Sequence, residues 1–162
     1  MKPINVNTLL YSEWKDKDPI VGNWLTDGTL TTIYADSGVG KTFLALYLAF
    51  CIAAKQPFLT FETFRRKVLF VDGEMGFAAL SCRSGQLAEG MSCDVPAEYL
   101  DFVSFEQFDG GMPNLVDPNH FGTWEEIIRP YQVIIIDNLD TCSYPIAPND
   151  GDQAQWFRLR PW

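Results

Sequence analysis

The sequence predicts an α/β domain with a mainly parallel sheet and flanking helices. Segments rich in β-branched residues alternate along the chain with segments of helical character, which is typical of parallel sheets. The segments 68–74, "VLFVDGE", and 132–139, "QVIIIDNL", are apolar runs that carry acidic residues at their ends, as buried parallel strands do. A glycine-rich turn joins the β-branched segment 29–35 to a strongly apolar segment, 43–54. These patterns favour a sheet whose polar residues gather at the carboxyl ends of its strands.

The first part of the chain leads into this sheet. Residues 1–28 are polar and irregular and are predicted to form an N-terminal segment, with the domain itself at 29–162. The segment 29–35, "TLTTIYA", is expected to be the first strand because threonine and isoleucine favour extended structure. The apolar segment after the glycine turn is expected to be a buried helix that ends before Pro57.

The same alternation continues along the chain. In order, we expect a loop at 57–67, a strand at 68–74, a helix at 76–91, a strand at 100–106, a loop at 107–123, a short helix within 121–131 and a strand at 132–139. Strand–helix alternation of this kind places successive strands parallel to one another.

Composition narrows the class of protein. The chain has 162 residues, of which 47% are hydrophobic and 20% charged, as expected of one globular domain. Its net charge of −9 argues against a protein whose surface as a whole binds nucleic acid. A local basic loop that contacts nucleic acid is not excluded by this charge. The longest apolar stretch, 43–54, is shorter than the roughly 20 residues of a membrane-spanning helix. Scattered cysteines without a C-x-x-C pair, and no signal peptide, predict reduced thiols in a cytoplasmic protein.

A phosphate-binding loop is the strongest functional signal. Residues 34–50 read "YADSGVGKTFLALYLAF", a tight turn that opens an apolar helix. Backbone N–H groups converge at such a helix N-terminus, the helix dipole favours anions there, and Gly38 and Gly40 permit the curl. Lys41 is expected to reach the β- and γ-phosphates of a nucleotide, and the Thr42 hydroxyl to bind Mg²⁺. The predicted nucleotide-binding residues are Ala35, Asp36, Ser37, Gly38, Val39, Gly40, Lys41 and Thr42. The pattern departs from G-x-x-x-x-G-K-[ST] only at its first position, where alanine replaces glycine.

Acidic residues follow two of the predicted strands. Asp137 ends an apolar β-branched run, and a carboxylate at that end of a strand can hold Mg²⁺ through its water shell. Asp140, which follows closely, is more consistent with a turn or a helix N-cap. Asp72 and Glu74 end another apolar run. From the residues alone, a carboxylate that activates water and an ordinary acid at a helix N-terminus are equally good interpretations of this pair.

At these residues the chain resembles a known family. The segments "ADSGVGKT", "VLFVDGEMG" and "VIIIDNLDT" come in the order and spacing of the RecA-like P-loop ATPases, with the strongest likeness to the plasmid RepA-type and DnaB-like hexameric helicases. The resemblance covers about residues 20–162. It implies that Glu74 is the catalytic base, that Lys41 acts on the transferred phosphate, and that Asp137 is the Walker B aspartate. The implied cofactors are ATP and Mg²⁺.

The chain also departs from this family. Family members continue past the Walker B loop into a helix and then a strand with a polar γ-phosphate sensor, which lies between the Walker A and Walker B strands. Here the sequence ends at "GDQAQWFRLRPW". The resemblance therefore implies the N-terminal part of a larger ATPase domain, truncated at its C-terminus. Arg158 and Arg160 are candidates for an arginine finger by position only, and solvated helix residues are the preferred interpretation.

Two classes of function follow from these residues. The first is ATP hydrolysis that drives helicase or recombinase work on DNA in the complete protein. The second is a nucleotide-binding module without significant turnover, and a P-loop kinase is a weaker third option because no arginine-rich lid is visible. If a central strand is missing, the open sheet edges predict self-association of this chain as a dimer or other oligomer. The resemblance implies a hexamer for the complete protein.

Overall fold

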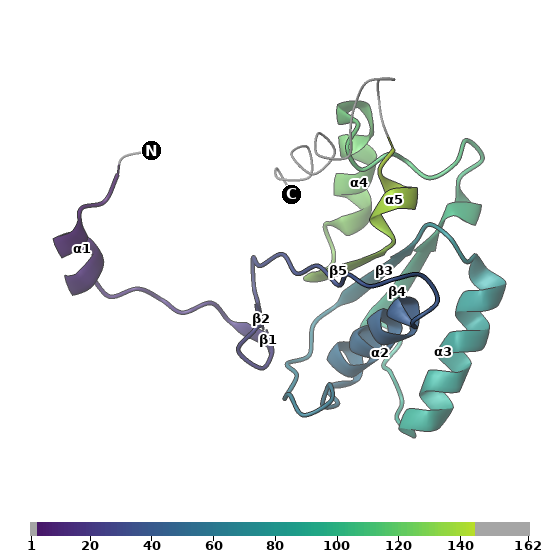
Figure 1. Ribbon diagram of the computed structural model, residues 1–162, viewed down its shortest axis with the longest axis horizontal. Coiled ribbons are helices and arrows are strands. Elements are labelled where there is room, and N and C mark those ends of the chain that lie inside the picture. Colours follow the sequence, from purple (N-terminus) through teal and green to yellow (C-terminus); the bar gives the residue numbers. More distant parts are fainter. Residues whose placement is uncertain (1–2, 145–162) are drawn as a thin grey trace.

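The computed structural model describes residues 3–144, and its centre is a three-stranded parallel sheet. The strands are β3 (Val68–Asp72), β4 (Leu100–Ser104) and β5 (Val133–Asp137), in the order β4-β3-β5. Helices α2 (Lys41–Ala54) and α3 (Phe77–Met91) lie on one face, and α4 (Phe121–Ile128) and α5 (Leu139–Cys142) on the other (Figure 1). The predicted α/β fold of a P-loop NTPase is confirmed.

Alternate residues of the strands enter two hydrophobic cores, one on each face of the sheet. Val68 and Phe70 of β3 pack with α2 and α3. Leu69 and Val71 pack on the opposite side with Trp124 of α4. Because helices cover both faces, every residue of β3 is buried, and this explains why its sequence is apolar without alternation.

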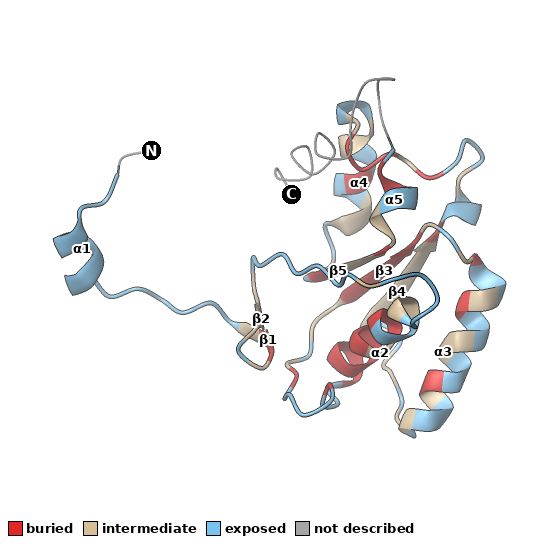
Figure 2. Ribbon diagram, in the orientation of Figure 1, coloured by how far each residue is buried: buried red, intermediate tan, exposed pale blue. Residues whose placement is uncertain are grey.

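Helix α2 is the most deeply buried helix of the described chain (Figure 2). Its apolar residues face the sheet on one side and α3 on the other, as the sequence predicted. The helix ends at Lys55, which adopts a left-handed conformation and donates its N–H to the carbonyls of Cys51 and Ile52. Pro57 follows, where a helix cannot continue.

The strands end earlier than predicted, because polar side chains bind the backbone that follows them. The strand expected to reach residue 106 ends at Ser104, whose hydroxyl caps the 3₁₀ helix η1 (Phe105–Gln107). The strand expected to reach residue 139 ends at Asp137, because Asn138 caps α5. A second 3₁₀ helix, η2 (Pro118–His120), leads into α4.

The strand predicted at 29–35 is wrong. Residues 29–36 form no strand, and the side chains of Leu30 and Tyr34 are 86% and 91% exposed. Among residues 3–144, β5 pairs only with β3, so its other edge is open and no strand lies beside the 29–35 segment. Extended residues without a neighbouring strand have no partner for their N–H and C=O groups, so local β-propensity alone does not produce a strand.

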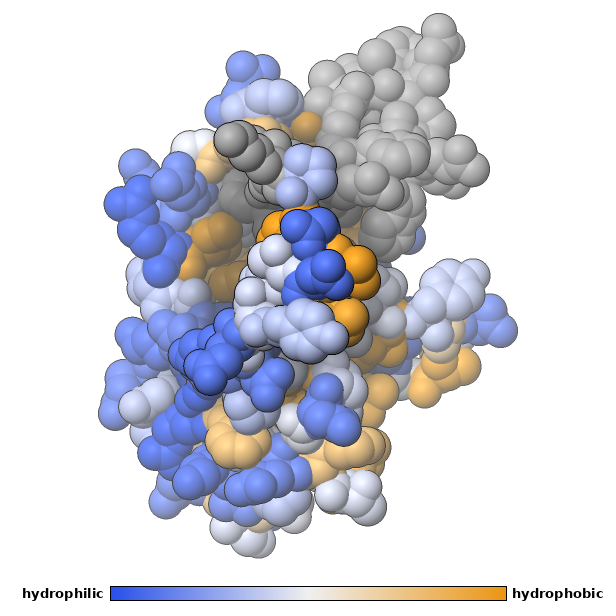
Figure 3. Space-filling view, turned by 90° about the vertical axis from the view of Figure 1, so that its left-hand side faces the viewer, coloured by the Kyte–Doolittle hydropathy of each residue, from blue (hydrophilic) through white to orange (hydrophobic). Residues whose placement is uncertain are grey.

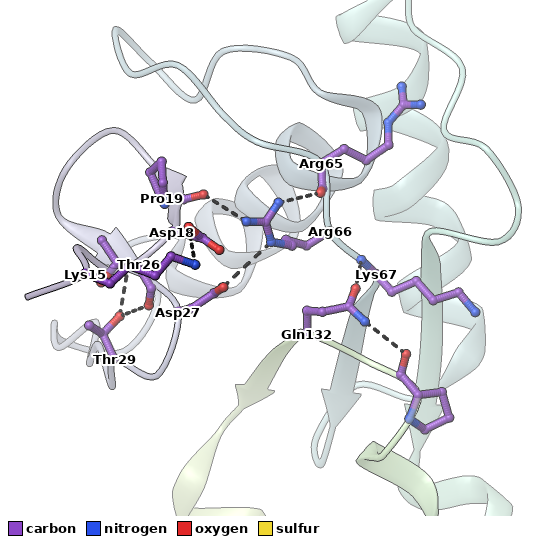
Figure 4. Close-up of polar contacts among 11 residues, drawn as sticks. Lys15, Asp18, Pro19, Thr26, Asp27, Thr29, Arg65, Arg66, Lys67 and Gln132 are labelled. Carbon is purple, nitrogen blue, oxygen red and sulfur yellow. Dashed lines mark hydrogen bonds and ion pairs between the residues drawn. The ribbon is translucent and has the colours of Figure 1, made fainter.

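A hairpin before this segment is attached to the body of the domain. Strands β1 (Pro19–Val21) and β2 (Leu25–Thr26) pair antiparallel, and Ile20 and Val21 enter the core beside α2. The Arg66 guanidinium holds the hairpin through the Pro19 carbonyl, at 3.3 Å, and the Asp27 carboxylate, at 3.7 Å (Figure 4). Arg66, in the loop predicted at 57–67, therefore fixes the hairpin to the body of the domain. The predicted domain boundary at residue 28 stays a prediction.

The N-terminal helix α1 (Val6–Tyr11) stands away from the body of the domain (Figure 1). No residue of α1 is buried. On the face of the molecule that carries this arm, hydrophobic side chains lie among hydrophilic ones (Figure 3). Within the described part of the chain, no helix combines the length and the apolar character needed to cross a membrane.

Candidate nucleotide-binding site

The glycine loop before α2 has the conformation that an anion-binding turn needs. Gly38 and Gly40 have φ values of 81° and 95°, a region that other residues enter only with strain. Gly40 is the N-cap of α2, and no side chain accepts a hydrogen bond from the first turn. Nothing lies within 4 Å of where a Cβ would stand at either glycine. The space beside both glycines is therefore open, and no side-chain cap competes with a phosphate for the first-turn amides of α2.

The Lys41 side chain folds back over this loop. Its Nζ donates hydrogen bonds to the carbonyl oxygens of Ala35, at 2.6 Å, and Asp36, at 2.7 Å. The ammonium group thus lies over the loop rather than in open solvent. A phosphate seated on the loop would offer it stronger, charge-assisted hydrogen bonds.

Thr42 and Asp137 meet across the end of the sheet. The Thr42 hydroxyl lies close enough to the Asp137 carboxylate to favour its ionised form. Burial nevertheless raises the pKa of Asp137 above its usual value, and the charges of Glu74 and Asp72 raise it further, while Arg83 opposes them. A nearby cation would therefore stabilise the ionised form of the Asp137 carboxylate. Hydroxyl and carboxylate oxygens are ligands that Mg²⁺ accepts.

Asp72 shapes the turn that follows β3. Its carboxylate is fully buried and accepts backbone N–H groups from Glu74, Met75 and Gly76, at 3.2, 2.8 and 2.8 Å. The Ser104 hydroxyl adds a fourth hydrogen bond at 3.1 Å. Of the two acids that end this segment, Asp72 is therefore committed to holding the backbone, whereas Glu74 is exposed.

The Glu74 side chain meets the end of β5. Its Oε2 accepts a hydrogen bond of 2.8 Å from the Asn138 side-chain amide. Asn138 was not singled out from the sequence. Its position after an apolar strand and just before a helical turn was the available signal, and it is Asn138, not Asp140, that caps α5. Asp140 lies exposed in the first turn of α5, so the N-cap alternative for it is wrong.

Gly73 allows these two strand ends to approach. Its N–H donates to the Asp137 carbonyl at 2.9 Å. A Cβ on Gly73 would overlap the Thr141 hydroxyl and would lie 2.8 Å from the Cys142 sulfur. Glycine is therefore required where α5 packs against the turn after β3.

A cavity of about 700 Å³ opens beside the loop, between α2 and α3. Its lining is mostly apolar and includes Ile33, Lys41, Phe43, Tyr47, Gln86 and Met91. The volume suits a small organic ligand, and its position next to the loop is compatible with a ligand whose phosphates occupy the loop.

A metal ion at this site would depend on the ligand. Among residues 3–144, no group of three or more His, Cys, Asp or Glu side chains is arranged to hold a metal. Mg²⁺ is typically bound through one or two protein oxygens together with substrate phosphates and water, which fits the Thr42–Asp137 pair. The arginine-finger candidates Arg158 and Arg160 lie outside the described residues.

Comparison with known proteins places the site in a wider context. Residues 7–157 match a family described as AAA domain. The chain is also 26% identical over 149 residues to the DNA repair protein RadA of Synechocystis sp. (strain ATCC 27184 / PCC 6803 / Kazusa). This match covers 89% of the chain and 27% of the RadA protein, so the chain spans about a quarter of the length of this relative.

Proposed function

The chain belongs to the AAA domain family and is a RecA-like P-loop ATPase, and on that premise we propose that it binds ATP with Mg²⁺ and hydrolyses the γ-phosphate. The observation that carries this proposal is the meeting of Thr42, Asp137 and Glu74 at one end of the sheet. These three side chains come from different elements, and their convergence beside the glycine loop supports a site for phosphoryl chemistry.

Each part of the proposed site has a chemical task. The amides of 38–42 and the Lys41 ammonium bind the phosphates, and the apolar cavity beside the loop takes the base and ribose. Thr42 and Asp137 hold the metal. When bound, Mg²⁺ supplies positive charge that neutralises the phosphate oxygens. The exposed Glu74 carboxylate orients a water molecule and accepts its proton as the water attacks.

The direct test is Glu74→Gln, which keeps the shape of the side chain and removes its basicity. We expect nucleotide affinity to stay within about twofold of the wild-type value and single-turnover hydrolysis to fall by about 100-fold or more. Glu89→Gln, at an exposed position near the end of α3, is the matched control and is expected to hydrolyse normally. Equal hydrolysis by Glu74→Gln and the wild type would overturn the proposed role of Glu74.

A second candidate, nucleotide binding without turnover, is favoured by one observation. The segment 29–36 that leads into the glycine loop has no strand neighbour within residues 3–144. A loop anchored only through α2 holds the phosphates less firmly, and small displacements of reacting groups are costly in rate. Tight nucleotide binding with no hydrolysis in the wild-type chain, even with excess protein, would select this function.

For the complete protein we propose helicase- or recombinase-type work on DNA, as in RepA-type and DnaB-like ATPases. The support is the match to a protein named for DNA repair. The chain itself has a net charge of −9 and is expected to bind DNA weakly. Stimulation of ATP hydrolysis by single-stranded DNA at low salt would support this proposal, and no stimulation in a longer protein would contradict it.

We also propose that this chain self-associates through a second copy placed along the edge of β5 that no strand of residues 3–144 covers. Open strand edges carry unpaired N–H and C=O groups that recruit other chains. Sedimentation over a range of concentrations is expected to show a dimer or larger species at high concentration. A single monomeric species at every concentration would remove this proposal.

A further inference from the structure

We propose that Asn138 is a positioning residue for Glu74, an inference that rests on the proposed role of Glu74 as general base. The Asn138 amide donates a hydrogen bond to Glu74 Oε2 at 2.8 Å, across 64 residues of sequence. One carboxylate oxygen is thereby held, and the other, Oε1, is left to accept a proton from water.

The direction of the Asn138 amide is fixed by its second contact. Its Oδ1 accepts hydrogen bonds from the Thr141 backbone N–H, at 3.0 Å, and from the Thr141 hydroxyl, at 3.2 Å. This cap uses the carbonyl end of the amide, so the NH₂ end must point the other way. The NH₂ end is the one that meets Glu74.

Helix α5 is itself tightly held, so Asn138 is a fixed support. Cys142 is fully buried, and the Leu115 N–H donates to its carbonyl at 2.8 Å. On the other side, α5 presses on Gly73, with the Thr141 hydroxyl touching the place of a Cβ. Any shift of Asn138 would have to displace α5 from both contacts.

Glu74, in contrast, has few contacts of its own among residues 3–144. Its N–H donates to buried Asp72, which fixes where the side chain starts. The side chain is exposed, and within residues 3–144 the structure gives its carboxylate one donor, the Asn138 amide. A glutamate side chain has several freely rotating bonds, so without Asn138 its carboxylate would sample many positions. Placement of the proposed base therefore depends on this one contact.

Two substitutions of Asn138 distinguish its contact with Glu74 from its role as the N-cap of α5. Serine and aspartate are good N-cap residues, so Asn138→Ser and Asn138→Asp both keep the cap of α5. Asn138→Ser removes the donor to Glu74, and Asn138→Asp replaces it with a like charge. Asn119→Ser, at an exposed position in η2, is the matched control.

The readout is single-turnover hydrolysis together with the nucleotide dissociation constant. We expect Asn138→Ser to hydrolyse about 10-fold more slowly with an unchanged dissociation constant and melting temperature, because a displaced base slows the reaction without weakening binding. Asn138→Asp is expected to be at least as slow, and Asn119→Ser to match the wild type. If Glu74→Gln is inactive but Asn138→Ser hydrolyses at the wild-type rate, the positioning inference is overturned while the proposed function stands.

A second measurement examines the contact without turnover. In ¹⁵N spectra, Glu74→Gln is expected to shift the Asn138 side-chain NH₂ signals and to leave those of Asn119 in place. Unmoved Asn138 signals would overturn the inference even in a protein that hydrolyses nothing. If Glu74→Gln hydrolyses ATP like the wild type, the proposed role of Glu74 as general base fails, and the inference about Asn138 fails with it.

Discussion

The Thr42 hydroxyl, in the first turn of α2, lies beside the Asp137 carboxylate at the end of β5 and favours its ionised form. This contact joins the glycine loop to the sheet from the helix side. On the other side, residues 29–36 have no strand neighbour within residues 3–144. The loop is therefore held through α2, whose apolar residues are packed in the core, rather than through a strand that precedes it.

Lys41→Ala is expected to weaken nucleotide binding by about 100-fold or more. Hydrogen bonds from a charged donor each contribute about 1.5–3 kcal/mol, and the Lys41 ammonium lies over the proposed phosphate loop, where it donates two hydrogen bonds to the loop carbonyls. Titration calorimetry with ADP and Mg²⁺ measures the loss. Lys55→Ala, at the other end of α2, is the control and should bind normally. Equal affinity in Lys41→Ala and the wild type would argue against the loop as the phosphate site.

Gly73→Ala and Gly85→Ala are expected to change stability in opposite directions. The added methyl at Gly73 would overlap Thr141 and crowd Cys142, so we expect a loss of about 2 kcal/mol in the free energy of unfolding. Gly85 lies in α3 with nothing within 4 Å, and alanine there should add up to about 1 kcal/mol through helix propensity. Urea denaturation compares the two. A gain of stability in both variants would contradict the close packing of α5 against Gly73.

Asp72→Ala is expected to destabilise the domain by about 3 kcal/mol or more. The substitution removes a buried carboxylate that accepts three backbone N–H groups and leaves those donors without an acceptor. Asp72→Asn keeps one oxygen and should fall between the wild type and alanine. Asp109→Ala, at an exposed site, should change stability by less than about 0.5 kcal/mol. Thermal unfolding of the three variants provides the ranking, and near-equal melting temperatures would contradict it.

The parts of the fold that could be predicted from sequence are those that local pattern decides. The segment 68–72 is apolar throughout because helices cover both of its faces, and that pattern is visible without a structure. The glycine loop could also be located, because left-handed conformations at Gly38 and Gly40 demand glycine. The segment 29–35 could not be assigned correctly in this way. Its β-branched residues favour extended backbone, but a strand also needs a partner, and pairing is not a local property.

The residues of the candidate site also differ in whether the sequence alone could predict them. Thr42, Glu74 and Asp137 could be proposed from their places next to a glycine turn or a strand end. The contact between Asn138 and Glu74 could not, because it joins residues 64 positions apart. The different roles of Asp72 and Glu74 could not be predicted from the sequence either. Only the structure separates Asp72, which is buried and fully bonded, from Glu74, which is exposed.

Cys51 is expected to make stability fall at alkaline pH. Burial raises the pKa of this thiol from 9.0 to about 11, so the unfolded chain loses the proton first. Between these pH values the folded state binds more protons than the unfolded state, and stability therefore falls as pH rises, by on the order of 2 kcal/mol. Below pH 9 the contribution is fully present. Cys51→Ala should lack this part of the slope, whereas Cys82→Ala, at an exposed position, should retain it. Parallel pH profiles of Cys51→Ala and the wild type would contradict the prediction.

Nucleotide is expected to protect the bond after Tyr34 from chymotrypsin. Tyr34 is 91% exposed in the unpaired segment before the loop, so the free protein should be cut there readily. Bound nucleotide would order the loop that begins at Ala35, and cleavage should slow by about 10-fold or more at saturating ADP and Mg²⁺. Tyr11, which is 85% exposed in α1, provides an internal control, because it lies in the arm away from the loop and should be cut at the same rate with or without nucleotide. Mass spectrometry of the fragments distinguishes the two sites. Lys41→Ala should abolish the protection at Tyr34, and equal cleavage at Tyr34 with and without nucleotide in the wild type would show that the ligand does not order this loop.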